Sequence, residues 1–148
     1  MYYSDCMPAI LEQARNRINE SGNARAMLST VSYLLDFCTV RVDLGRGTGA
    51  TTFMQGNMKR QDVAFFHSHA QLQRFRRLSG VHVTQLFHFS KSTMDRFRPY
   101  RFPVNVDVTF WVDEVYPTWD FEHLDLLYSQ IATRLRSNDD APLIVLLG

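Results

Sequence analysis

Apolar residues along the chain recur with two periods, which separate the expected helices from the expected strands. Over residues 7–18 they recur every three or four positions, the spacing that places them on one helix face. Pro8 suits the first turn of this helix, and Ser21-Gly22 predicts its end. A second helix, capped by Asn23 and reaching Leu35, is expected next. Both helices are expected to pack against a sheet.

The rest of the chain alternates between strand and helix patterns. Val63-Ala64-Phe65-Phe66 is a continuously apolar run, typical of a strand buried on both faces. Further strands are expected at residues 38–42, 81–89, 104–112 and 143–147, and helices at 51–58, 69–78 and 120–136. This alternation predicts an α/β fold, with a mainly parallel sheet flanked by helices. We expect one domain over residues 1–148, with a helical segment at 1–37 and an α/β core at 38–148.

Composition is that of a globular domain, with 45% hydrophobic and 21% charged residues among 148. No apolar run is long enough for a transmembrane helix, and the N-terminus lacks the pattern of a signal peptide. We therefore expect no membrane contact. The two cysteines, Cys6 and Cys38, are too few for a disulfide framework, which favours a cytoplasmic location.

The charges are segregated although the net charge is only +1. The segment Arg74–Arg101 is strongly basic and contains a single acid, Asp95, whereas residues 107–125 carry acids and no lysine or arginine. Arginine makes bidentate contacts with phosphate, so the basic segment is compatible with a phosphate-containing partner.

A glycine-rich stretch between the expected strand at 38–42 and the next helix is the first candidate site. It reads Gly45-Arg46-Gly47-Thr48-Gly49-Ala50-Thr51-Thr52. Glycines allow backbone N–H groups to turn inward and approach an anion closely. The N-terminus of the following helix would point its free N–H groups at the same anion. The stretch is therefore a candidate phosphate-binding loop.

The loop departs from the pattern G-x-x-x-x-G-K-[ST] in two places. Leu44 replaces the first glycine, unless Gly45 takes its place, and Ala50 replaces the lysine. Thr51 stands where the Mg²⁺-binding hydroxyl is expected, and Arg46 is long enough to supply the missing positive charge. The alternative is a tight strand-to-helix turn that binds no ligand.

A pair of acids follows the β-prone run at residues 104–112. Asp113 and Glu114 would lie at the carboxyl end of that strand. Because parallel strands end at the same edge of a sheet, we expect Asp113 to face the glycine loop. The alternative is that both acids are solvated side chains at a strand end.

These two motifs resemble the Walker A and Walker B motifs of P-loop NTPases of the additional-strand class. The glycine loop, with Arg46 three residues before Gly49, is most similar to that of tailed-phage large terminase subunits. The resemblance implies a Mg²⁺-dependent ATPase, a hydrolase related to viral DNA-packaging motors, in a minimal or truncated version of the fold. It also implies that Asp113 coordinates Mg²⁺ through water and that Glu114 activates the attacking water. A viral protein of this kind would act in the host cytoplasm.

The basic segment leaves several partners open. Arginines and aromatic residues interleave there, which suits contact with single-stranded DNA or RNA. It equally suits an arginine finger that reaches a neighbouring copy in a homo-oligomer, and a solvated surface is the simpler account. His67 and His69 lack the partners of a metal site. The alternative functions are an inactive module that binds nucleic acid or protein through this segment, and a phosphate-transferring kinase.

Overall fold

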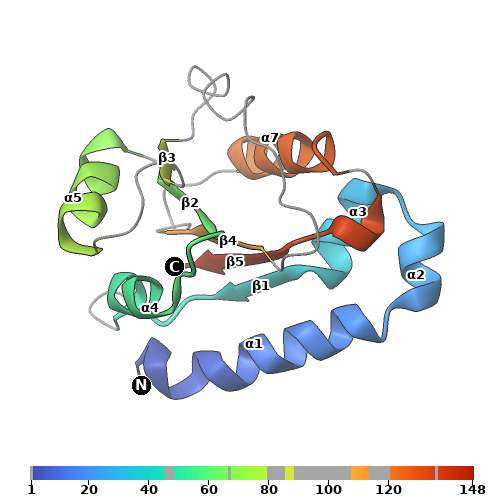
Figure 1. Ribbon diagram of the computed structural model, residues 1–148, viewed down its shortest axis with the longest axis horizontal. Helices are drawn as coiled ribbons and strands as arrows, with labels where there is room; N and C mark the ends of the chain where they lie inside the picture. Colours follow the sequence, from blue (N-terminus) through green and yellow to red (C-terminus); the bar gives the residue numbers. More distant parts are fainter. Residues whose placement is uncertain are drawn as a thin grey trace.

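The computed structural model describes residues 2–45, 49–66, 68–79, 86–88, 108–113, 121–135 and 137–148. In this part of the chain, a five-stranded parallel sheet carries helices on both faces (Figure 1). The helices are α1 (Tyr3–Asn19), α2 (Gly22–Met27), α3 (Thr30–Phe37), α4 (Ala50–Asn57), α5 (His69–Ser79), α7 (Phe121–Ala132) and the short 3₁₀ helix η3 (Asn138–Asp140). The strands are β1 (Thr39–Val42), β2 (Val63–Phe66), β3 (Leu86–His88), β4 (Thr109–Val112) and β5 (Leu143–Leu147).

The strand order is β1-β5-β4-β2-β3, and every neighbouring pair is parallel. The last strand therefore lies between the strand that precedes the glycine loop and the strand that precedes Asp113. Ile144 fixes the register at the centre, because it pairs with Thr39 on one side and Phe110 on the other. All five carboxyl ends lie at one edge. The predicted α/β fold with a parallel sheet is confirmed.

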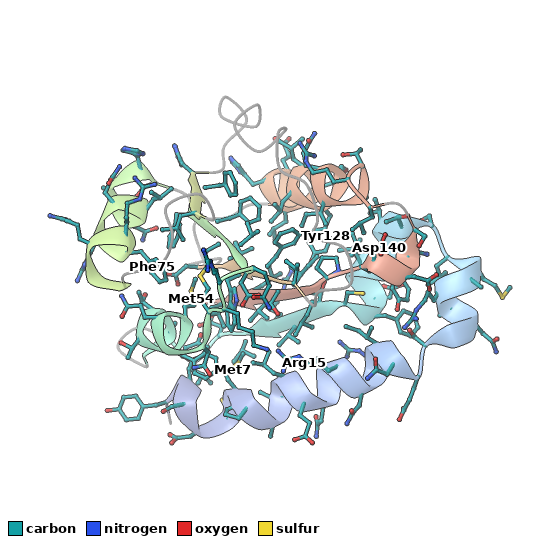
Figure 2. The ribbon with its side chains drawn as sticks, in the orientation of Figure 1. Met7, Arg15, Met54, Phe75, Tyr128 and Asp140 are labelled. Carbon is teal, nitrogen blue, oxygen red and sulfur yellow. The ribbon has the colours of Figure 1, made fainter. Side chains whose placement is uncertain are left out.

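Successive strand residues point to opposite faces, and each face is covered by its own helices. Val63 and Phe65 face α3 and α7, whereas Ala64 and Phe66 face α1, α4 and α5. Figure 2 labels Met7, Met54 and Phe75, one from each of these last three helices, and Tyr128 of α7 on the opposite face. Because both faces are covered, all strand side chains of β2, β4 and β5 are buried.

The start of the first helix differs from the prediction. Pro8 was expected in the first turn, but α1 begins at Tyr3, so this proline lies inside the helix. Tyr3 and Met7 are both fully buried, and their burial favours the additional N-terminal turn. Proline lacks the N–H that would bond to the carbonyl of Ser4. Both Ser4 and Pro8 are exposed, so water can satisfy that carbonyl.

The predicted second helix is divided into α2 and α3. Asn23 is not its cap; Ser29 caps α3 by accepting a hydrogen bond from the Ser32 N–H at 3.3 Å. The break at Leu28 is held from a distant part of the chain. The Asn138 side-chain amide donates to the carbonyls of Arg25 and Leu28, at 2.9 and 3.0 Å.

The remaining predicted elements are present within the described residues. Helices α4, α5 and α7 and strands β1, β2 and β5 lie where the pattern predicts them, with shifts of a few residues at the ends. The strands expected at 81–89 and 104–112 are confirmed over β3 and β4, and residues 81–85, 89 and 104–107 lie outside the described part. Residues 90–103, between these two strands, also lie outside it.

Candidate functional site

The described ends of the glycine loop adopt the backbone conformation that glycine permits. Gly45 has φ of 85° and Gly49 has φ of 86°, both in the left-handed region. A side chain at either position would strain the backbone. Gly49 is also the N-cap residue of α4. The positive φ therefore explains why glycine stands at both ends of the loop. Residues 46–48 lie outside the described part.

The base of the loop is anchored by α1 through the fully buried Tyr3. Its hydroxyl lies 2.8 Å from the Gly148 carbonyl and 3.0 Å from the Val42 carbonyl, and it accepts a hydrogen bond from the Leu44 N–H at 3.3 Å. The Gly148 N–H in turn donates to the Val42 carbonyl at 2.9 Å. Burial raises the pKa of the Tyr3 phenol, so it stays protonated and can donate at neutral pH. This hydroxyl joins α1 and the ends of β1 and β5.

The N-terminus of α4 faces the loop without a side-chain cap. Its first intrahelical bond runs from the Phe53 N–H to the Gly49 carbonyl at 2.8 Å, and Gly49, as the N-cap residue, has no side chain that could accept from the following N–H groups. The N–H groups of Ala50, Thr51 and Thr52 precede that bond and lack an intrahelical acceptor. Three donors at the positive end of the helix dipole suit an anion.

The two candidate motifs meet at this edge of the sheet. The Thr51 hydroxyl donates a hydrogen bond to Asp113 Oδ2 at 3.1 Å, although the residues are 62 positions apart in the sequence. Asp113 directly follows β4 and is only 4% exposed, and its N–H donates to the Phe65 carbonyl at 3.4 Å. The expectation that Asp113 would face the glycine loop agrees with this contact.

A cavity of about 230 Å³ opens beside the Thr51–Asp113 contact. It lies between α4 and α5, which pack next to each other at the carboxyl edge of the sheet (Figure 1). Its described lining residues are Thr51, Thr52, Gln55, Phe66, Gln71, Arg74, Phe75 and Asp113. One carboxylate, two hydroxyls, two carboxamides and one guanidinium therefore surround a partly apolar space.

The oxygen atoms of the site suit Mg²⁺ in part. This ion prefers hard oxygen ligands and is bound through one or two carboxylates, with waters and substrate phosphates completing the octahedron. Thr51 and Asp113 supply such oxygens. No group of three or more His, Cys, Asp and Glu side chains with metal-site geometry occurs among the described residues. The described residues therefore fit a Mg²⁺ ion that is also bound by phosphate oxygens and water. They do not supply all the ligands of such an ion by themselves.

Several predicted site residues lie outside the described part of the chain. They are Arg46, Gly47, Thr48 and Glu114. His67 and most of the basic segment Arg74–Arg101 lie outside it as well. Of the arginines on α5, Arg74 borders the cavity, whereas Arg77 is exposed and is not among its lining residues. His69 lies on α5, with its ring 6.3 Å from that of His88 and its Nε2 3.0 Å from the Gln73 amide.

Sequence reasoning missed three residues of this region. Tyr3 anchors the loop from the first helix, and Gln55 and Gln71 line the cavity. The helical periodicity held a weak signal for Gln71. It precedes the buried Leu72 and lies one turn before Arg74, so both polar residues follow one stripe of α5 beside its apolar face.

No protein-family model, curated protein or solved structure matches this sequence. Among the described residues, no helix has both the length and the apolar character needed to cross a membrane.

Proposed function

We propose that this chain is a P-loop-type domain that binds a nucleoside triphosphate, with ATP as the first candidate, together with Mg²⁺. The observation that carries the proposal is the 3.1 Å hydrogen bond from the Thr51 hydroxyl to Asp113. It joins the helix after the glycine loop to the end of β4, across the intervening β5. The position of β5 between β1 and β4 supports the resemblance to P-loop NTPases of the additional-strand class.

Each part of the site has a distinct task in this proposal. The uncapped N–H groups at the start of α4 bind phosphate oxygens, and the positive φ of Gly45 and Gly49 lets the backbone turn around them. Thr51 and Asp113 hold the Mg²⁺ shell. The ion supplies neutralisation of charge on the phosphates. Tyr3 keeps the base of the loop fixed to β1 and β5.

The wider role follows from the resemblance and stays a prediction. Glu114 would activate the attacking water and Arg46 would supply charge, and both lie outside the described residues. Action as a nucleic-acid motor in the cytoplasm, and assembly into a homo-oligomer, extend the same proposal. The alternative, a module that binds nucleic acid or protein without turnover, is separated from it by measuring phosphate release.

The test is the nucleotide-dependent shift in melting temperature, measured with and without Mg²⁺. We expect Mg²⁺-ATP to stabilise the unmodified protein, and Thr51→Val to weaken the apparent affinity by about tenfold or more. Thr133→Val is the matched control, because Thr133 is an exposed threonine directly after α7. Its hydroxyl donates to the Gln130 carbonyl at 2.9 Å and accepts from the Arg134 guanidinium at 3.2 Å, and both partners are near it in the sequence. Absence of any shift at millimolar Mg²⁺-ATP would overturn the proposal.

Phosphate release is measured on the same samples. We expect Glu114→Gln to stop release while nucleotide binding stays. If the unmodified protein binds nucleotide but releases no phosphate, the alternative of an inactive module is supported, because the site would hold nucleotide without hydrolysing it.

A further inference from the structure

The site lacks a cation at the position where the loop pattern places one. Ala50 is the first residue of α4 and carries no charge. A bound triphosphate brings several negative charges into a partly buried space, and charge-assisted contacts with cationic side chains are the strong interactions there. Arg46 of the loop is expected to supply one positive charge, and a positive group from another element would add to it in compensating for the missing lysine.

Helix α5 brings polar residues to the cavity because its apolar stripe is fixed to the sheet. Leu72 and Phe75 are 3% and 2% exposed, and the Phe75 ring packs 5.1 Å from that of Phe66 in β2. Gln71 and Arg74 are three positions apart and therefore share a face of the helix beside that stripe. Both line the cavity that also contains Thr51 and Asp113.

Arg74 is the only cationic residue among the described lining residues of this cavity. Its side chain is exposed overall, and no hydrogen bond or ion pair joins it to another residue in the described ranges. The guanidinium is thus held near the site by its helix and is available to a ligand. Its planar donors match the geometry of phosphate oxygens.

A second, independent observation points to a polar occupant. The Gln71 Oε1 atom is buried, and no donor among the described residues forms a hydrogen bond with it. A buried acceptor without a partner costs about 1–3 kcal/mol, so a donor that enters the cavity from outside would be favoured. A water ordered by a bound nucleotide would satisfy this carbonyl.

We propose that Arg74 binds the terminal phosphate of the nucleotide within the same chain, in the charge-compensating role that Ala50 lacks. Gln71, one turn earlier, accepts a hydrogen bond from a water beside that phosphate. This inference rests on the proposed function and deepens it. It differs from an arginine finger that acts on a neighbouring copy, because the cavity that Arg74 lines belongs to its own chain.

The experiment compares the affinities of ATP and ADP, both with Mg²⁺, by isothermal titration calorimetry. We expect Arg74→Ala to weaken ATP binding by about tenfold or more, which is the loss of one charged contact, and ADP binding by less than about threefold. Arg77→Ala is the matched control, since Arg77 is an exposed arginine on the same helix that does not line the cavity. It should leave both affinities unchanged.

A second substitution, in α4, distinguishes the loss of a positive charge from a general effect of Arg74→Ala on the fold. Adding Ala50→Lys to Arg74→Ala should restore ATP affinity to within about threefold of the unmodified protein, because the new lysine would replace the lost charge. Circular dichroism and melting temperature check that each variant is folded.

The possible failures point to different parts of the account. If the unmodified protein binds ATP and Arg74→Ala binds it equally well, the Arg74 proposal is wrong and the proposed function stands. Equal losses of ATP and ADP affinity would also overturn the proposal. ADP lacks the terminal phosphate of ATP, so losing a contact with that phosphate cannot weaken ADP binding. If the unmodified protein binds neither nucleotide, both proposals fall.

Discussion

Two buried aspartates at opposite edges of the sheet show how differently one side-chain type can be used. Asp62 is 2% exposed and precedes β2 at the amino edge. Its Oδ1 accepts from the Thr109 N–H at 3.1 Å, and its Oδ2 accepts from the Lys59 N–H at 2.9 Å and from the Trp111 indole N–H at 3.2 Å. This carboxylate ties the turn before β2 to β4.

Asp113 is almost equally buried, at 4% exposed, but it follows β4 at the carboxyl edge and borders a cavity. The contact that distinguishes it is with the Thr51 hydroxyl, itself an oxygen of the kind that Mg²⁺ prefers. Burial alone therefore does not identify a functional carboxylate. The distinction lies in whether its neighbours are fixed donors of the fold or groups that can share a ligand.

The largest expected effect is on stability and comes from Asp62→Ala. The substitution leaves the Thr109 N–H and the Trp111 indole N–H buried without an acceptor, and each such loss costs about 1–3 kcal/mol. We therefore expect the free energy of unfolding to fall by about 3–5 kcal/mol. Urea denaturation measures this. The exposed Asp36→Ala is the matched control, with an expected change below about 0.5 kcal/mol. An equally small effect of Asp62→Ala would contradict its structural role.

The contribution of Tyr128 to stability at alkaline pH gives the next largest effect, because the hydroxyl of this residue, like the Asp62 carboxylate, has its hydrogen-bond partner within the fold. The Thr39 hydroxyl donates to the Leu34 carbonyl at 2.8 Å, so the Tyr128 hydroxyl donates to Thr39. Burial raises the pKa of Tyr128 from 10.0 to about 12 and that of the Cys38 thiol from 9.0 to about 12. Folding therefore favours the protonated form of both groups.

Their contribution to stability is complete below pH 9 and is lost as the pH rises from 9 to 12. From the shift of Tyr128 alone we expect a loss of about 2–3 kcal/mol between pH 10 and 12. Urea denaturation across this range measures the loss, and Tyr128→Phe should reduce it. An identical pH dependence in that variant would show that another group is responsible.

Tyr3→Phe tests the support under the glycine loop. It removes the hydroxyl that contacts Val42, Leu44 and Gly148, and we expect a loss of about 1–2 kcal/mol in stability. If the loop binds nucleotide, its affinity should fall as well, because the loop base is less fixed. The exposed Tyr2→Phe is the matched control and should change neither property. Unchanged stability in Tyr3→Phe would mean that this hydroxyl does not hold the loop.

Much of this fold follows from local sequence patterns. The buried run at 63–66 predicts β2, and the rule that parallel strands end at one edge predicts that Asp113 faces the glycine loop. The insertion of β5 between β1 and β4 could not be predicted, since strand order depends on pairings between distant segments. The break at Leu28 is fixed by Asn138, 110 residues away.

The contacts that hold the site in place could not be predicted from the sequence either. Tyr3 reaches Gly148 across 145 residues, and nothing local to an amphipathic helix marks one buried tyrosine as the anchor of a loop. Asp62 lies in a turn, where a solvated aspartate is the usual expectation, and only the packing of Trp111 against it gives it buried donors.

The central claim, that Asp113 belongs to a Mg²⁺–nucleotide site whereas Asp62 holds the fold, is tested most directly with one variant and two readouts. Asp113→Asn keeps the shape of the side chain and removes its charge. We predict a change in unfolding free energy below about 1 kcal/mol and a loss of Mg²⁺-ATP affinity of about tenfold or more by titration calorimetry, with Asp36→Asn neutral in both. A variant that binds Mg²⁺-ATP as tightly as the unmodified protein would contradict the claim.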